Sequence, residues 1–553
     1  VNKAGDDYLN VAVRGSDGSL YLAGYSYGNF GEPNGGGADA VIVKLTPGGK
    51  VDSKFAVNGI WHLGFGTFGA SGNDHINALA LDEAGNLFVA GHTESSLSGT
   101  NAGGSDGFVI KMDATYGLLD SNFGDGDGAD NDGILQINAS NASDASSNEE
   151  LTSLSIDGLG NLFAAGHTES SISGTNAGGY DGFVIKIDAI NGLLDSNFGD
   201  GDGLDNDGIL QINGTNTSGA TSDEYIKAMA YESGKLFLAG WTRGAISGVS
   251  GGWIDSFVIK LDASNGVLDS NFGDGDGSDN DGVLQINASN ATDASERDVL
   301  YDMSLDGAGN IFIAGSTDGD LSGSNAGMTD IFVIKINSTS GILDPDFGDG
   351  DGLDNDGILQ INASNASDAS DWDNAYGITL DGVGNLYITG QTYSSLSGTN
   401  AGSGDGFIVK VNASSGELDL NFGDGDGSNN DGILQINANN ASDASGYDIV
   451  YAITLDSVGN LYIAGESESS LSGINAGGRD WFVSKISSSS GELDSNFGDG
   501  DGSDNDGILQ LNESEGIDAT NYEYISAMAL DNAGNLFVAG YIETDSGSYS
   551  AYV

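Results

Sequence analysis

Apolar and polar side chains alternate along this chain in short runs that return at a regular spacing. The clearest copy begins with Ile-Asn-Ala-Leu-Ala-Leu at 76–81, turns through 82–86 and continues with Leu-Phe-Val-Ala-Gly at 87–91. Two more apolar runs follow at 108–112 and 133–138. Short runs rich in β-branched and aromatic residues, bounded by Gly, Asn, Asp and Ser, predict β-strands. Each repeat is therefore expected to supply four strands and no helix.

The pattern recurs after about 75 residues, as from Asp125 to Asp200. The second strand is the easiest to follow, because Leu or Ile followed by Phe or Tyr opens it each time. These pairs are Leu20-Tyr21, Leu87-Phe88, Leu162-Phe163, Leu236-Phe237, Ile311-Phe312, Leu386-Tyr387, Leu461-Tyr462 and Leu536-Phe537. Four strands in every long repeat predict a β-propeller. A β-solenoid is the weaker alternative, because its coils are shorter and these turns are typical of hairpins.

The predicted fold class is all-β: one β-propeller of four-stranded antiparallel blades, with eight blades over 1–553. The first strand of each blade is expected to be innermost and the fourth outermost. The blades are expected at about 1–75, 76–150, 151–225, 226–299, 300–374, 375–449, 450–524 and 525–553, the last of them incomplete.

Charge narrows the classes of partner. The 553 residues include 82 acids and 16 bases, which gives a formal net charge of −66. This charge argues against binding to nucleic acid or to anionic membrane surfaces. No apolar run is long enough for membrane insertion, and the absence of Cys excludes disulfides and Cys-based metal sites. Divalent cations, or a strongly hydrated surface, fit the composition better.

An acidic loop stands before the fourth strand in six repeats, and its first copy is Gly-Asp-Gly-Asp-Gly-Ala-Asp-Asn-Asp-Gly at 124–133. Carboxylates this close repel one another, and glycine adds backbone entropy that folding must remove. Ca²⁺ binds several oxygens at short range, and glycine lets the backbone bend to supply them. The loops therefore predict about six Ca²⁺ sites. The alternative is a solvated Asp/Gly turn that repeat duplication has copied.

Each acidic loop offers four candidate Ca²⁺ ligands. They are Asp125, Asp127, Asp130 and Asp132; Asp200, Asp202, Asp205 and Asp207; Asp274, Asp276, Asp279 and Asp281; Asp349, Asp351, Asp354 and Asp356; Asp424, Asp426, Asn429 and Asp431; Asp499, Asp501, Asp504 and Asp506. Asn429 is a neutral oxygen donor, so its loop is expected to bind Ca²⁺ more weakly. The first repeat has Phe-Ala-Val-Asn-Gly at 55–59 in place of the loop.

Two other groups of polar residues recur or stand out. In seven repeats an Asp precedes the third strand of the repeat. This Asp is expected to cap a turn rather than to bind a metal. The copies are Asp39, Asp106, Asp181, Asp255, Asp330, Asp405 and Asp480. The four histidines are His62, His75, His92 and His167, and only His92 and His167 fall at equivalent positions, after the second strand. A zinc site is possible there, but ordinary loop histidines are the favoured interpretation.

The repeat resembles known bacterial families. Ala-Leu-Ala-Leu-Asp-x-x-Gly-Asn-Leu-Phe-Val-Ala-Gly at 78–91, followed by Asp-Gly-Phe-Val-Ile-Lys at 106–111, is similar to the SBBP-type β-propeller repeat. Gly-Leu-Leu-Asp-Ser-Asn-Phe-Gly at 117–124 resembles the related delta-60 repeat. The resemblance covers essentially the whole chain. It implies a propeller and an extracellular or cell-surface location, and it implies no shared enzymatic activity. The acidic loop departs from the usual repeat.

The favoured function is a non-catalytic, calcium-binding extracellular or cell-surface protein with a structural or adhesive role. One alternative is a propeller enzyme, a hydrolase or lyase acting on an extracellular polysaccharide at a central channel. A multivalent lectin that binds surface glycans is the other. Trp61, Trp241 and Trp253 interrupt the repeat in its first and fourth copies, so a single pocket would be expected there.

The last repeat predicts an open sheet edge, because the sequence stops where its third strand belongs. An unpaired edge invites a further strand. One expectation is exchange of a strand with a neighbouring copy, which repeated head to tail would build a fibre. The favoured alternative is a longer chain whose own upstream segment completes the blade.

Overall fold

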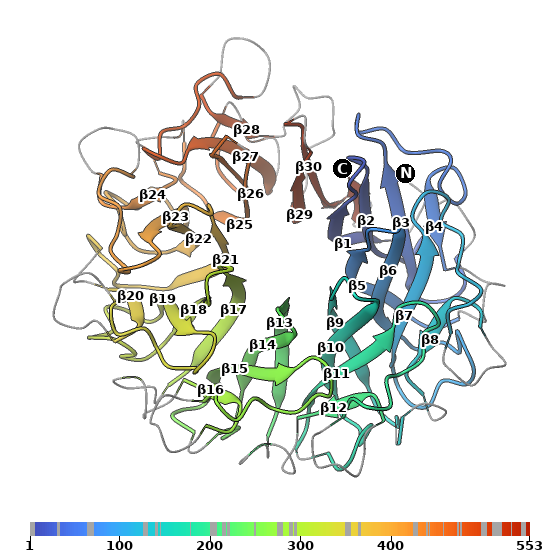
Figure 1. Cartoon of the computed structure of the whole chain (residues 1–553). Coiled ribbons are helices and arrows are strands. Elements are labelled where there is room, and N and C mark those ends of the chain that lie inside the picture. The colour runs from blue at the N-terminus through green and yellow to red at the C-terminus, as the bar shows by residue number, and fades with distance from the viewer. Residues whose placement is uncertain are drawn as a thin grey trace. The chain divides into compact units, whose positions relative to one another are not determined.

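The structure is a computed structural model, and Figure 1 shows its strands. It describes residues 6–29, 34–63, 71–124, 131–138, 142–143, 145–176, 178–199, 207–212, 217, 222–247, 250–273, 280–286, 291, 296–348, 356–362, 366–423, 430–437, 441, 443–456, 458–472, 475, 478–498, 506–510, 522–531, 534–543 and 549–552. Throughout these ranges the regular elements are strands, and none is a helix.

The chain divides into two compact units. The first unit comprises Val1–Ser250, Ser256–Gln285 and Ser548–Tyr552, and the second comprises Gly251–Asp255, Ile286–Gly547 and Val553. The predicted fold class is confirmed: seven antiparallel sheets have four strands each, and an eighth has three strands within the described part of the chain.

The strands of repeats one to four are β1 (Asp7–Arg14), β2 (Leu20–Ser26), β3 (Asp39–Leu45), β4 (Ile60–His62), β5 (Asp74–Leu81), β6 (Asn86–Thr93), β7 (Asp106–Asp113), β8 (Ile134–Gln136), β9 (Glu149–Ile156), β10 (Asn161–Thr168), β11 (Asp181–Asp188), β12 (Ile209–Gln211), β13 (Glu224–Glu232), β14 (Lys235–Thr242), β15 (Asp255–Asp262) and β16 (Val283–Gln285). Within each sheet these strands lie in the order of the sequence.

The strands of repeats five to eight are β17 (Asp298–Leu305), β18 (Asn310–Thr317), β19 (Asp330–Asn337), β20 (Ile358–Ile361), β21 (Asp373–Leu380), β22 (Asn385–Thr392), β23 (Asp405–Asn412), β24 (Ile433–Gln435), β25 (Asp448–Leu455), β26 (Asn460–Ser467), β27 (Asp480–Ser487), β28 (Ile508–Gln510), β29 (Glu523–Leu530), β30 (Leu536–Glu543) and β31 (Tyr549–Tyr552).

The first strands of neighbouring sheets contact one another within each unit. In the first unit β1 contacts β5, β5 contacts β9 and β9 contacts β13; in the second unit β17 contacts β21, β21 contacts β25 and β25 contacts β29. The fourth strand of each sheet pairs only with the third. The first strand is therefore innermost within its unit and the fourth strand lies at the outer edge, as the repeat pattern predicts.

Apolar side chains join each sheet to the next. In one cluster Phe88 and Val109 of the second repeat pack with Leu162 and Ile185 of the third, and all four are fully buried. The third strand is buried on both faces, because a neighbouring sheet covers each of them. In β7 seven of eight residues are buried. Burial of this apolar surface is the main force that holds the repeats together.

A bulge near the start of each first strand sets the direction of the side chains around it. In β5 the register with β6 shifts at Asn77, whose Nδ2 donates to the backbone oxygen of Leu151 in the next sheet, 3.0 Å away. Gly91 lies opposite, where an added Cβ would come within 1.8 Å of the His75 backbone oxygen. The bulge therefore needs glycine across from it, and it turns residue 77 toward the neighbouring sheet.

The last repeat supplies a third strand, β31, which the sequence pattern had placed at this point. β31 belongs to the first unit, where the backbone N–H of Tyr549 donates to Asp6 Oδ1 at 2.9 Å. The ring of Tyr549 lies 5.6 Å from that of Tyr8 on β1. Strand exchange between copies of the chain stays a prediction.

Candidate functional site

The acidic loops are described only at their ends. The first three candidate ligands of each loop lie outside the described residues; they are Asp125, Asp127, Asp130, Asp200, Asp202, Asp205, Asp274, Asp276, Asp279, Asp349, Asp351, Asp354, Asp424, Asp426, Asn429, Asp499, Asp501 and Asp504. The fourth candidate of each loop is described; these are Asp132, Asp207, Asp281, Asp356, Asp431 and Asp506.

All six acidic loops begin and end in the same way. In the second repeat the backbone N–H of Gly133 donates to Phe123 O at 2.7 Å. Gly133 has a φ of 95°, which a side chain would strain. Asp132 Oδ1 accepts the backbone N–H of Ile134 at 3.0 Å. One carboxylate oxygen of the fourth acid therefore ties the loop to the fourth strand.

A lysine on the third strand anchors the chain before each acidic loop, and in five of these six repeats it is buried. Lys111 on β7 is 5% exposed, and its Nζ lies 2.8 Å from Asp120 Oδ2. The same Nζ lies 5.8 Å from the ring centre of Phe88 and 6.0 Å from that of Phe123. Equivalent pairs are Lys186–Asp195, Lys260–Asp269, Lys335–Asp344, Lys410–Asp419 and Lys485–Asp494. The entry to every loop is thus fixed by the same ion pair.

The Asp that precedes the third strand caps a turn, as predicted. Asp106 is fully buried, and Asp106 Oδ2 accepts the backbone N–H of Ala102 at 3.1 Å. The same oxygen accepts Gln136 Nε2 at 2.8 Å. Gln136 is also fully buried, and its Oε1 accepts the backbone N–H groups of Leu97 and Ser98. The sequence analysis did not anticipate this glutamine, which joins the cap to the fourth strand.

A second buried acid opens each first strand, and the sequence analysis missed it. Asp74 donates its backbone N–H to Ala38 O at 2.6 Å, which brings it beside Asp39 of the preceding sheet. Burial raises the pKa of Asp74 to about 7, although Thr93 donates a hydrogen bond to it, and Asp39 adds to the increase. Burial likewise raises the pKa of Asp39 to about 6. Two carboxyl groups therefore meet at this sheet boundary, and burial raises the pKa of both.

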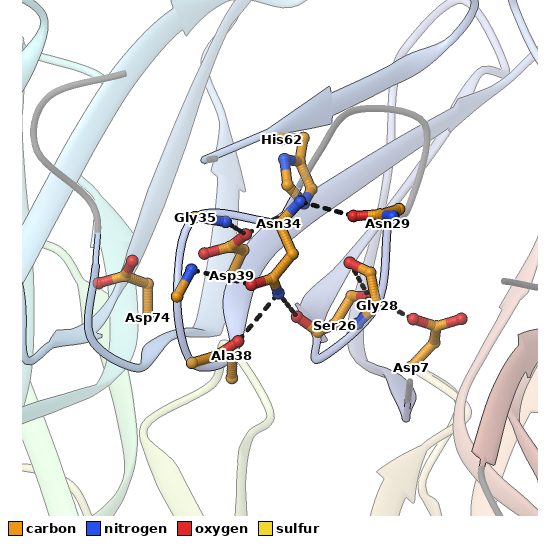
Figure 2. Close-up of polar contacts among 12 residues, drawn as sticks. Asp7, Ser26, Gly28, Asn29, Asn34, Gly35, Ala38, Asp39, His62 and Asp74 are labelled. Atoms are coloured by element: carbon orange, nitrogen blue, oxygen red, sulfur yellow. Dashed lines mark hydrogen bonds and ion pairs between the residues drawn. The ribbon is translucent and has the colours of Figure 1, made fainter. Parts of the chain in front are cut away.

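Figure 2 shows this arrangement in the first repeat. His62 takes the place that Gln136 has in the second repeat, with His62 Nε2 at 3.5 Å from Asp39 Oδ2. Burial lowers the pKa of His62 to about 4, so the imidazole is neutral at pH 7. At the opening of β1, Asp7 accepts a hydrogen bond from Ser26. The first repeat therefore keeps the buried acids without the glutamine.

The interpretation of His92 and His167 as loop histidines is wrong. Both lie inside second strands, at the seventh residue of β6 and of β10. His92 Nδ1 lies 3.8 Å from Glu150 Oε1, and His167 Nε2 lies 3.5 Å from Glu150 Oε2. Their side chains are 18% and 13% exposed. The two imidazoles therefore flank one carboxylate, from neighbouring sheets.

Rings continue from this cluster along the first unit. On one side, Tyr25 stacks on His75 with ring centres 3.9 Å apart, and His75 lies 4.8 Å from His92. On the other side, His167 lies 4.9 Å from Tyr225, which stacks on Trp241 at 4.3 Å. We call the set Tyr25, His75, His92, Glu150, His167, Tyr180, Tyr225 and Trp241 the aromatic band. Trp241 was expected to mark a single pocket, and it lies at one end of the band.

Neither a metal centre nor a membrane span is found in the part of the chain that the structure describes. There, no three His, Cys, Asp or Glu side chains have an arrangement that could hold a metal ion. Likewise, the described residues include no helix long and apolar enough to cross a membrane.

The sheets and their order define a β-propeller repeat protein. The SBBP β-propeller repeat family matches residues 358–396 and 432–471, so these two segments are SBBP repeats. Each match runs from a fourth strand through the first two strands of the next repeat. The stretch between the two matches, 397–431, holds the third strand β23 and most of the acidic loop. The similarity of 117–124 to the delta-60 repeat stays a prediction.

No curated protein matches the chain. Among solved structures, the extracellular domain of a presumed one-component system, BT4673, from B. thetaiotaomicron is 14% identical with a TM-score of 0.28 over 98% of this chain. The chain spans 54% of that protein's length. Drosophila Semaphorin 1a, extracellular domains 1-2, is 10% identical with a TM-score of 0.34, covering 99% of this chain and 86% of that one. A PL25 ulvan lyase is 11% identical with a TM-score of 0.35, covering 83% and 91%. Likenesses this distant carry no functional argument.

Proposed function

We propose that this chain is a non-catalytic, calcium-binding extracellular repeat protein with a structural or adhesive role. The observation that supports it best is the common closure of six acidic loops, each held by a Gly N–H bonded to a Phe carbonyl at 2.7 Å. Four acidic or amide side chains within eight positions of the sequence repel one another where they are charged, and a bound cation relieves that repulsion. About six Ca²⁺ ions would bind.

The entry and exit of each loop are tied to the sheet, which supports the calcium site over the solvated turn. The buried lysine pair holds one end, with Lys410 Nζ 2.7 Å from Asp419 Oδ2 in the sixth repeat. The Asp431 carboxylate holds the other end through the backbone N–H of Ile433 at 3.1 Å. Preorganised ends reduce the entropy that ordering the loop would cost.

The test is metal content together with thermal unfolding before and after chelation. Elemental analysis should find about six Ca²⁺ per chain, and EDTA should lower the melting temperature, because ions that bind only the folded state stabilise it. Asp205→Asn in the third repeat should remove or weaken one site. Glu83→Gln, an exposed acid outside the loops, is the matched control and should leave the stoichiometry unchanged. A chain free of metal, with a melt that EDTA does not change, would contradict the proposal.

The adhesive or structural role rests on repetition. Six near-identical loops on outer strands present the same chemistry several times, and several weak contacts made together can give strong attachment. Partners of two kinds fit: surface glycans, and further copies of the chain joined head to tail by an exchanged strand. Electron microscopy of the purified chain with Ca²⁺ should then show filaments. A monodisperse monomer under all conditions would remove the fibre.

A further inference from the structure

The aromatic band interrupts an otherwise regular repeat. It occupies mainly two register positions, the second residue of the first strand and the residue that pairs with it on the second strand. In repeats one to four these positions hold Tyr8 and Tyr25, His75 and His92, Glu150 and His167, and Tyr225 and Trp241. In repeats five to seven they hold Val299 and Ser316, Asn374 and Gln391, and Ile449 and Glu466. In repeat eight they hold Tyr524 and Tyr541, whose rings also stack, with centres 4.8 Å apart. Histidine and tryptophan occupy these positions only in the first unit.

The side chains at these positions face one another across strands and between sheets. Tyr225 and Trp241 are directly opposed in the pairing of β13 with β14. Tyr180 from the neighbouring sheet lies 5.1 Å from Tyr225 and 5.4 Å from His167. Tyr180, Tyr225 and Trp241 are each partly exposed. Part of their apolar ring surface is therefore open to a ligand.

Polar atoms with unused hydrogen-bonding capacity lie between the rings. His75 Nε2 and His167 Nδ1 are buried and have no hydrogen-bond partner among the described residues. Burial lowers the pKa of His75 to about 4 and also lowers that of His92, so both imidazoles are neutral at pH 7. A neutral imidazole offers one donor and one acceptor. Glu150 adds an acceptor, positioned by Asn77 Nδ2 at 3.1 Å.

The charged side chains around the aromatic band favour neither an anionic nor a cationic ligand. Lys227 Nζ lies 5.8 Å from the Tyr225 ring, and the Arg243 guanidinium lies 5.8 Å from that of Trp241. Arg243 is already paired with Asp223 at 2.8 Å. Glu150, Glu169 and Asp223 outnumber these two bases, so a polyanion gains little here. An organic cation is disfavoured too, because the Arg243 guanidinium already occupies a place beside the Trp241 ring.

We propose that the aromatic band binds a neutral saccharide. Sugar hydroxyls both donate and accept hydrogen bonds, which matches the partly exposed Glu150 carboxylate and Asn77 amide beside the rings. The C–H faces of a pyranose ring pack on partly exposed aromatic surface. The proposed site lies where histidines and Trp241 occupy these positions, in the first unit, and it is not repeated from blade to blade as lectin pockets would be. It does not depend on calcium in the acidic loops.

The test is isothermal titration of the Ca²⁺-supplemented chain with cellohexaose, laminarihexaose and mannohexaose as neutral probes, and with an alginate oligomer and choline as charged ones. At least one neutral probe should bind at one site per chain. Trp241→Leu and Tyr225→Ala should each weaken that binding about 30-fold, as for a central contact residue. Trp241→Phe, which keeps a ring, should lose less. The melting temperature of each variant reports on folding.

The matched controls are Asn374→Ala and Gln391→Ala, which change the same register positions in the second unit and should bind the neutral probe as the parent chain does. Asp205→Asn, in an acidic loop, should also leave binding intact, which separates this proposal from the calcium proposal. Binding of none of the neutral probes, binding of alginate or choline alone, or full affinity in Trp241→Leu would overturn the saccharide site.

Discussion

Side chains on the outer strands recur from repeat to repeat, whereas side chains at the starts of the inner strands differ between repeats. At the outer strands the same Lys–Asp pair, the same glutamine and the same loop closure recur from repeat to repeat; Lys186, Lys335 and Lys410 are each 5% to 6% exposed. At the inner strand starts, the equivalent residues are Tyr, His, Glu, Val, Asn and Ile. Residues that recur from repeat to repeat build the framework, and residues that differ between repeats can bind a specific ligand.

Burial explains the difference. A lysine on a third strand is enclosed by sheets on both sides, so its charge must be met by one acid at one distance. The second residue of a first strand is only partly covered in most repeats, with Val299 and Ile449 the buried exceptions, and several side chains fit there. The comparison teaches that departures from a strong repeat are the first place to look for specific binding. Changes to the framework should therefore affect stability more than changes to the aromatic band.

The largest effect is expected from Gly390→Ala in β22. An added Cβ would lie 1.8 Å from the backbone oxygen of Asn374 and 2.7 Å from the Phe407 ring. Since backbone cannot move aside cheaply, the free energy of unfolding should fall by about 3 kcal/mol. Gly48→Ala, at a position with nothing within 4 Å, is the control and should change little. Urea unfolding of both variants measures the difference, and equal midpoints would contradict the bulge argument.

The next effect concerns the buried ion pair and depends on pH. Burial alone would raise the pKa of Asp344, but the hydrogen bond from Lys335 and the Asp346 backbone N–H lower it overall. This group therefore stabilises the fold above its unfolded pKa, and the stabilisation is lost as the pH falls through the lower folded pKa. Lys335→Met should cost about 2 kcal/mol at pH 7, and this cost should shrink below about pH 4.

Thermal unfolding at pH 7, 5, 4 and 3 tests the prediction for Lys335→Met, with Lys50→Met, at an exposed lysine, as the control. A loss of stability that stays the same at every pH would mean that packing of the lysine stem, and not its charge, holds the loop entry.

Much of the framework could be predicted from local sequence, and the aromatic band could not. The strands and the turn cap at Asp106 follow from residues close together in the chain. The burial of Asp74 depends on the sheet before it, which no local pattern reports. His92 was placed in a loop because Gly91 looks like the end of a strand. In fact Gly91 lies within the strand, across from the bulge, and the strand continues through Thr93.

The smallest stability effect is expected at the aromatic band. Glu150→Gln keeps the size of a side chain that is 37% exposed and still accepts from Asn77, so the free energy of unfolding should change by no more than about 0.5 kcal/mol. The reverse exchange in the framework is the control. Gln360 is fully buried and donates to Asp330 at 2.8 Å, so Gln360→Glu removes a donor, sets two carboxyl groups together and should cost about 2 kcal/mol. Urea unfolding of the two variants compares one chemical exchange in two settings. Equal losses would mean that the band is as much a part of the framework as the glutamine, and the division between the two regions would fail.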